Sequence, residues 1–294
     1  MSVPVAVVDA PPATLGEGPM WSPRDRALFW IDVVGKTLFR FQPATGKTET
    51  RSLPFAPSAV FPHADGGLLL VTKKGLALYD FEKEELKSIP VPGIDFSVEI
   101  FNDGACDLHG RLWLGTRHFH RTEPLGSLYC LTPDFKLARQ SSGFVVSNGL
   151  AWSLDRRTLY HVETRPGRIY AYDFDEQEGA VSNRRTFMEY GSSRAGHPDG
   201  CTIDEKGGLW VAEVEGSCIA RYLPDGRFDR DIPLPVSKPT SVMFGGDDLS
   251  MLFVTSMTFG LSESRLQNEP LAGHLLMVDA GVKGLAEPRF GLEP

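Results

Sequence analysis

The sequence predicts an all-β protein, a single six-bladed β-propeller, and three observations lead to that fold class. A short strand phrase recurs six times, and its hydrophobic cores begin at residues that lie 40 to 50 positions apart: Leu28, Leu68, Leu112, Leu159, Leu209 and Leu252. The stretches between them alternate in polarity and lack helical periodicity. No composition shift divides the 294 residues, so one domain over residues 1–294 is expected. A strand-rich repeat near 45 residues is typical of propeller blades.

The repeats divide the chain into six blade-sized segments, each with turn residues at hairpin spacing. Pro43–Gly46 and Pro224–Gly226 are examples, in which Gly supplies a positive φ and Pro fixes the first turn position. The segments are 17–56, 57–101, 102–146, 147–197, 198–238 and 239–280. Two stretches exceed turn length, 117–124 and 260–273, and are expected to form loops at a rim.

An additional strand is expected before the first repeat, at residues 5–9. A closed set of blades must not leave a free sheet edge, because an exposed edge invites pairing with other chains. The N-terminal strand is therefore predicted to close the last blade by pairing near residues 275–278.

Composition and charge exclude several classes of function. With 41% hydrophobic and 23% charged residues, the chain can bury a large core, and its net charge of −8 disfavours nucleic-acid binding. Neither a signal peptide nor a long apolar segment is visible. We expect a cytoplasmic protein, a monomer or weak homo-oligomer, without a membrane partner. The cysteines, predicted to be reduced and buried, are Cys106, Cys130, Cys201 and Cys218.

The residues that open the innermost strands form the candidate site, because a propeller brings these strand starts to one axial pocket. In four of the six copies, a carboxylate or carboxamide residue stands one or two positions before a Gly: Glu17, Asn102, Asn148 and Asp199. Such oxygen donors suit a divalent cation. Asn-Gly and Asp-Gly are also ordinary turn pairs, so a purely structural role stays open. Glu-Gly is not a favoured turn pair, so the presence of Glu17 in register favours the metal-binding interpretation.

Five motifs in this order resemble one known family over essentially the whole chain. They are Leu15–Trp21, Phe101–Gly104, Ser147–Asp155, Pro198–Gly200 and Phe244–Gly246. The chain is similar to the regucalcin, senescence-marker-protein, gluconolactonase and luciferin-regenerating-enzyme group. The resemblance implies a six-bladed propeller with one divalent ion (calcium, zinc, manganese, magnesium or iron) and the hydrolysis of a small-molecule sugar lactone.

Matched residue by residue, the resemblance places the metal ligands at Glu17, Asn148 and Asp199, and a substrate contact at Asn102. Asp199 is implied as the general base. The chemistry is consistent, because a metal polarises a lactone carbonyl and activates water, while a carboxylate takes the proton. The sequence contains no Gly-x-Ser-x-Gly motif for a nucleophilic serine.

The chain departs from the family beside Asn102. Where the family often has an Arg, this sequence has Ile100, preceded by Glu99. We hypothesise that Arg117 replaces the missing cation and that His118 or His120 faces the substrate; the alternative is that all three are solvated loop residues. The residues predicted to contact substrate are Asn102, Arg117, Glu99, Ile100 and His120.

Two other functions compete with a sugar lactonase. A promiscuous arylesterase or phosphotriesterase of the same fold is favoured by the apolar Ile100 and by Phe119 in the neighbouring loop. A non-catalytic calcium-binding propeller is the third possibility, since a fold does not imply a function. The charge pair of Glu17 and Asp199 argues against it.

Overall fold

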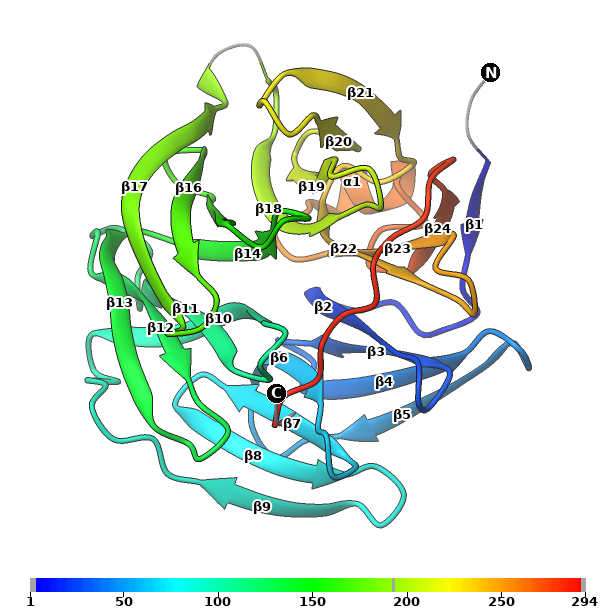
Figure 1. Ribbon diagram of the computed structural model, residues 1–294. Coiled ribbons are helices and arrows are strands. Elements are labelled where there is room, and N and C mark those ends of the chain that lie inside the picture. Colours follow the sequence, from blue (N-terminus) through cyan, green and yellow to red (C-terminus); the bar gives the residue numbers. More distant parts are fainter. Residues whose placement is uncertain (1–3, 192–193, 292–294) are drawn as a thin grey trace. The chain divides into compact units, whose positions relative to one another are not determined.

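A computed structural model describes residues 4–191 and 194–291 of the chain. Within these ranges the protein consists of six four-stranded antiparallel sheets and one short helix, α1 (Glu263–Asn268) (Figure 1). Each sheet is one blade, so the predicted all-β, six-bladed propeller fold is confirmed. The blades are numbered here in chain order.

The strands follow one another in sequence within the first five blades. Blade 1 contains β2 (Gly16–Ser22), β3 (Ala27–Asp32), β4 (Thr37–Gln42) and β5 (Lys47–Ser52). Blade 2 contains β6 (Pro57–Pro62), β7 (Leu68–Thr72), β8 (Gly75–Asp80) and β9 (Glu85–Ile89). Blade 3 contains β10 (Glu99–Cys106), β11 (Leu112–His118), β12 (Gly126–Leu131) and β13 (Leu137–Phe144).

Blades 4 and 5 repeat this plan, and blade 6 varies it. Blade 4 contains β14 (Ser147–Trp152), β15 (Thr158–Glu163), β16 (Arg168–Asp175) and β17 (Ala180–Glu189). Blade 5 contains β18 (His197–Ile203), β19 (Leu209–Val214), β20 (Cys218–Tyr222) and β21 (Phe228–Pro233). Blade 6 contains β22 (Pro239–Gly245), β23 (Met251–Ser256), β24 (Leu276–Asp279) and the N-terminal β1 (Val5–Val7).

The predicted pairing of the N-terminal strand is confirmed. Strand β1 runs antiparallel to β24, with Val5 opposite Val278 and Val7 opposite Leu276 (Figure 1). Just beyond the strand, the Val8 N–H donates to the Leu275 carbonyl at 2.9 Å. The beginning of the chain thus supplies the fourth strand of the blade built from its end.

The chain divides into two compact units. The first unit comprises the residues up to Ala56 and Tyr190–Ala286, and it contains blades 1, 5 and 6. The second unit comprises Pro57–Glu189 and the residues from Glu287 onward, and it contains blades 2, 3 and 4. In the first unit β22 packs against both β2 and β18, and in the second unit β10 packs against both β6 and β14. The single-domain organisation stays a prediction.

The core lies between neighbouring blades and is rich in aromatic rings. Trp113 of blade 3 packs edge-on against Phe174 of blade 4, with ring centroids 5.5 Å apart. Its indole N–H donates to the buried Asp107 carboxylate at 2.9 Å, so the ring fills the core without leaving a polar atom unpaired. All four cysteines are free and buried, as predicted.

The two long loops are only partly irregular. In the first, residues 117 and 118 belong to β11 and residues 119–124 form the loop that follows it. The second, 260–273, contains α1, whose Ser262 side chain caps the helix by accepting from the Arg265 N–H. None of the helices in the described residues is long and apolar enough to cross a membrane.

Candidate functional site

Every innermost strand departs from regular pairing at one place. A β-bulge, which inserts a residue into one strand and re-aims its side chains, interrupts the pairing of all six with their neighbours. The bulges lie between Glu17 and Met20, Pro57 and Ala59, Phe101 and Gly104, Ser147 and Leu150, Pro198 and Cys201, and Pro239 and Ser241. The four predicted site residues that the repeats aligned, Glu17, Asn102, Asn148 and Asp199, all lie in these bulges.

The glycines of the bulges are explained by backbone conformation and by close packing. Gly18 has a φ of 53°, which side chains other than hydrogen rarely allow. A Cβ on Gly200 would lie only 2.0 Å from the Ser241 hydroxyl oxygen. These glycines therefore permit both the bulged backbone and close packing of neighbouring inner strands.

In the first unit, the two predicted carboxylate ligands are carried by strands on either side of β22. The Thr240 hydroxyl donates to the carbonyl of Gly16, the residue before Glu17, at 2.5 Å. On the other side, Gly200 packs against Ser241, which brings Asp199 next to the same bulge. Asp199 is buried and Glu17 is partly buried. Two acidic side chains therefore flank one neutral, hydroxyl-bearing strand.

In the second unit, the structure brings the two predicted amides into direct contact. The Asn102 Nδ2 donates to Asn148 Oδ1 at 2.8 Å and to the Ser147 carbonyl at 2.9 Å. The Asn148 Nδ2 in turn donates to the Thr164 hydroxyl at 2.6 Å. Asn148 is only 6% exposed. These bonds fix the orientation of both amide groups.

Arg117 lies next to Ile100 and Asn102, as required by the hypothesis that it replaces the cation missing at Ile100. Its backbone pairs with Ile100 across β10 and β11, and its Nε donates to Asn102 Oδ1 at 3.1 Å. Its Nη1 donates to the His118 and Phe119 carbonyls at 3.2 and 3.0 Å. Burial, together with the positive charge of Arg121, lowers the pKa of Arg117 to about 10. Arg117 is therefore a buried, ordered cation rather than a solvated loop residue.

Glu99 has a different surrounding from the one the sequence suggested. Its carboxylate accepts hydrogen bonds from the Thr116 hydroxyl and, at 2.7 Å, from the Tyr129 hydroxyl, all within blade 3. Burial and this bond raise the pKa of Tyr129 to about 12. Ile100 is 1% exposed. Substrate contact by Glu99 and Ile100 stays a prediction, and the bonds of Glu99 indicate that it braces the blade.

The two loop histidines do not share one strand face, because β11 ends at His118. The Glu123 N–H lies 3.4 Å from His118 Nδ1, to which it donates, and the Thr122 hydroxyl lies 3.2 Å from the same nitrogen. His120 is exposed, and its ring lies against Phe119 with centroids 5.1 Å apart. His118 therefore holds the loop together, while substrate contact by His120 stays a prediction.

Three buried acids, to which the sequence alone assigned no role, share one position of the repeat. Asp32, Glu163 and Glu213 lie at or one residue before the end of the second strand of blades 1, 4 and 5, directly opposite the residue that precedes each predicted metal ligand. Each lies four positions after the leucine that begins the strand core, and the other three blades have Thr72, Thr116 and Ser256 there. An acid at that repeat position accompanies only the blades with a predicted ligand, and this signal could have identified it.

Each acid holds the segment that leads into the ligand-bearing strand. Asp32 accepts the N–H groups of Thr14 and Leu15 at 2.7 and 3.0 Å. Glu163 accepts the Val145 N–H at 2.8 Å, although burial raises the pKa of Glu163. These contacts fix the direction in which the strand enters its bulge, in the way that residues behind a ligand tune a metal site.

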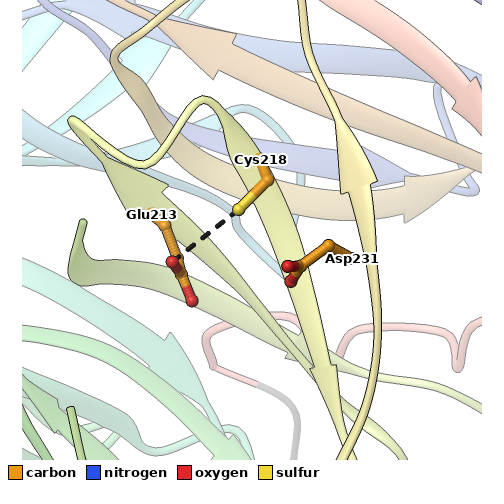
Figure 2. Close-up of side chains that lie close together, drawn as sticks. All are labelled: Glu213, Cys218 and Asp231. Atoms are coloured by element: carbon orange, nitrogen blue, oxygen red, sulfur yellow. Dashed lines mark hydrogen bonds between the residues drawn. The ribbon is translucent and has the colours of Figure 1, made fainter. Parts of the chain in front are cut away.

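Glu213 performs this role through an ion pair. The Arg194 Nη2 lies 2.6 Å from Glu213 and 2.7 Å from Asp231, and the guanidinium stacks over Phe228 at 4.9 Å. Arg194 stands five residues before Asp199, so its ion pair with Glu213 holds the segment that leads into β18. Figure 2 shows Glu213, Cys218 and Asp231 around this point, with a hydrogen bond from Cys218 to Glu213.

The cluster in Figure 2 has the composition of a metal site but not its electrostatics. Its three ligand atoms lie within 4.8 Å of one another, the one such group of His, Cys, Asp or Glu found in residues 4–191 and 194–291. Arg194 already forms ion pairs with both carboxylates. Burial, with the charges of Glu213 and Asp231, raises the pKa of Cys218 to about 12, which disfavours the thiolate that a metal needs. The cluster is therefore a salt-bridge network.

Comparisons with known proteins agree with these observations. Residues 15–258 match the family described as SMP-30/Gluconolactonase/LRE-like region. The chain is 35% identical to 6-deoxy-6-sulfogluconolactonase of Pseudomonas putida, over 95% of this chain and 96% of the relative. It is 31% identical to regucalcin of Xenopus laevis, over 98% and 99%. A solved structure of a luciferin-regenerating enzyme superposes with a TM-score of 0.92 at 29% identity, covering 99% of this chain and 100% of that one.

Proposed function

Since the chain belongs to the SMP-30/gluconolactonase/LRE-like family, we propose that it is a hydrolase that opens a lactone ring with the help of one divalent metal ion. The observation that carries the proposal is the set of bulges, which present oxygen-bearing side chains at equivalent positions of several blades. The lactonase among its relatives supports a lactone as the substrate.

We assign Glu17, Asn148 and Asp199 as the metal ligands. Two carboxylates and one amide oxygen are hard donors, which suit calcium, magnesium or manganese and are also accepted by zinc and iron. The Asn148 amide is held by Thr164 and Asn102, so its oxygen is already oriented. When bound, a divalent ion polarises a carbonyl and lowers the pKa of water.

The protein side chains supply the proton transfers and the orientation of the substrate. Water adds to the lactone carbonyl carbon, and Asp199 takes its proton as general base. The ring C–O bond then breaks, and the proton passes to the departing ring oxygen, which gives a hydroxy acid. Asn102 contacts the substrate, and Arg117 holds the Asn102 amide by its bond to Oδ1. No covalent intermediate with the protein is required.

The test is proton release from a panel of sugar lactones, aromatic lactones and aryl esters. Metal-stripped protein receives each divalent ion in turn, beside the variants Asp199→Ala and Asp225→Ala. Asp225 lies in an exposed turn of the same blade and serves as the control. We expect hydrolysis that returns with metal, disappears in Asp199→Ala and persists in Asp225→Ala. Equal activity with and without metal, or in both variants, would contradict the proposal.

One observation favours a second candidate. Phe119 is 50% exposed beside Arg117, which offers an aromatic surface to a substrate. A preference for aryl esters or aromatic lactones over sugar lactones in the same panel would identify an arylesterase. Calcium binding by calorimetry without turnover of any substrate would identify a binding protein instead.

A further inference from the structure

Three cationic residues of the second unit stand on two segments, the turn between β7 and β8 and the end of β11 with its loop, which hydrogen bonds join to the strand that carries Asn102. Lys73 stands in the turn between β7 and β8, and its carbonyl accepts the N–H of Phe101, the neighbour of Asn102, at 3.4 Å. Arg117 stands near the end of β11. Arg121 follows in the same loop, with its N–H donating to the His118 carbonyl at 3.0 Å and a φ of 58°. We call these three residues the cation cluster.

The cation cluster has no acidic partner. Among residues 4–191 and 194–291, no carboxylate forms an ion pair with Lys73, Arg117 or Arg121, whereas the buried Arg111 pairs with Asp107 at 2.6 Å. Burial, then the charges of Arg117 and Arg121, lower the pKa of Lys73. Positive charges that are close together and partly desolvated destabilise one another unless an anion joins them. The cluster is therefore prepared for a negatively charged ligand.

The cation cluster is joined to the residues assigned to substrate and metal. The Arg117 Nε donates to Asn102, and Asn102 donates to Asn148. The remaining parts of the cluster face outward: Lys73 is partly buried and Arg121 is exposed, so a ligand can reach them from solvent. Arginine and lysine together are the usual recognition groups for sulfonate, phosphate and carboxylate oxygens.

We propose that Lys73, Arg117 and Arg121 bind an anionic substituent of the substrate, a sulfonate, phosphate or carboxylate remote from the lactone carbonyl. This inference rests on the proposed lactone hydrolysis and narrows its substrate class to lactones that carry a negative charge. It differs from the arylesterase alternative, which the apolar Ile100 and the exposed Phe119 favour.

The experiment uses one aldonolactone ring with four termini: hydroxymethyl, sulfomethyl, phosphomethyl and carboxylate. The full-length protein, Lys73→Gln, Arg121→Gln and the control Lys74→Gln are assayed for kcat/KM with metal present. Lys74 is the exposed neighbour of Lys73. We expect the wild type to prefer at least one charged terminus by about tenfold, since two or three charges act at short range. Each cluster variant should reduce kcat/KM for that substrate by about fivefold and change the neutral substrate little.

Two further measurements separate electrostatic recognition from a loss of fold. Salt should weaken the preference of the wild type, because exposed charges are screened within about 10 Å at 0.1 M ionic strength. Lys73→Glu should reverse the preference toward the neutral lactone. The terminus with the largest effect identifies the anion among sulfonate, phosphate and carboxylate.

The failure of this inference is distinguishable from failure of the proposed function. Hydrolysis of the neutral lactone with no gain for any charged terminus, and with Lys73→Gln and Arg121→Gln unchanged, overturns the inference and leaves the lactonase intact. Absence of turnover with every lactone overturns the proposed function. Calorimetry with the sulfonated ring-opened acid then tests the cluster: weaker binding by Lys73→Gln than by Lys74→Gln supports it. Inorganic sulfate that binds as tightly as the sulfonated acid would indicate a site for free anions, and would overturn it.

Discussion

The bulges of the two units share one backbone arrangement, but the side chains that they carry differ in charge. In the first unit, the bulged strands β2 and β18 present Glu17 and Asp199, two carboxylates beside a hydroxyl-bearing strand. In the second unit, β10 and β14 present the amides of Asn102 and Asn148, and the guanidinium of Arg117 donates to Asn102. The repeat thus determines where a side chain emerges, and the residue type determines whether that position carries a carboxylate or an amide.

The units differ also in how they neutralise buried charge. In the first unit, Arg194 and Arg221 each meet a carboxylate within 2.7 Å. In the second unit, Arg111 follows the same rule, but the cation cluster does not. An unneutralised group of cations in a protein with a net charge of −8 is a site where a ligand, rather than the fold, supplies the counter-charge.

The largest effect is expected from a change at the acidic residues of the first unit. Glu17→Gln removes one of the two negative charges assigned to the metal, so we expect divalent-ion affinity to fall by at least about 100-fold. Calorimetric titration of metal-stripped protein measures it. Glu263→Gln, an exposed change on α1 in the same unit, is the control. Equal affinity in wild type and Glu17→Gln would remove Glu17 from the ligand set.

A smaller effect is expected behind the ligand in blade 5. Glu213→Gln weakens the ion pair with Arg194 that fastens the approach to Asp199, and we expect metal affinity to fall by about 10-fold. Arg194→Gln should produce the same loss, and the double variant little more, because both changes break one interaction. Additive losses measured in the double-mutant cycle would mean that the two residues act separately.

The variant Arg117→Met tests the role of the cation in the second unit. This change removes the donor to Asn102 Oδ1, so we expect KM for the neutral lactone to rise by about tenfold, and KM for charged lactones to rise further because a charge of the cation cluster is lost as well. Lys73→Gln, in contrast, should affect charged lactones alone. Arg139→Met, an exposed arginine on β13, serves as control. A KM for the neutral lactone that does not change with Arg117→Met would separate Arg117 from substrate orientation.

The smallest effect concerns Asp103, the carboxyl beside Asn102 in the bulge of β10. Burial raises its pKa to about 6, against one offsetting hydrogen bond from the Gly104 N–H. Because the folded pKa lies above that of the unfolded chain, the native state favours the neutral acid. Its stabilising contribution is complete below about pH 4 and is lost as pH rises through about 6.

Asp103→Asn removes this titration. The melting temperature of the variant minus that of wild type should therefore increase between pH 4 and 7, by about 2 °C for each kcal/mol involved. Asp95→Asn is the control, because hydrogen bonds from Ser97 lower the pKa of Asp95, so its contribution changes only below about pH 4 and its difference from wild type should stay nearly constant between pH 4 and 7. Scanning calorimetry of the metal-free proteins measures both. A difference that does not vary with pH would show that Asp103 stays ionised.

Much of the fold could be predicted because its signals are local. Strand cores such as Leu112–Leu114 and the turn residues between them recur with a fixed spacing, and each blade pairs mainly with itself. The alignment of Glu17, Asn148 and Asp199 followed from the same repeat. The hydrogen bonds of Glu99 to Thr116 and Tyr129, in contrast, were not predictable, because they join separate strands of blade 3.

The sequence by itself therefore determined the blade number, the N-terminal closure and the positions of the bulged residues, because these depend on short-range periodicity. Only the tertiary structure decided which distant side chains meet. The bond from Arg117 to Asn102, the ion pair of Glu213 with Arg194 and the hydrogen bond from Phe101 to the Lys73 carbonyl each join separate segments. Such contacts depend on how turns direct side chains in space, and no spacing along the chain encodes that direction.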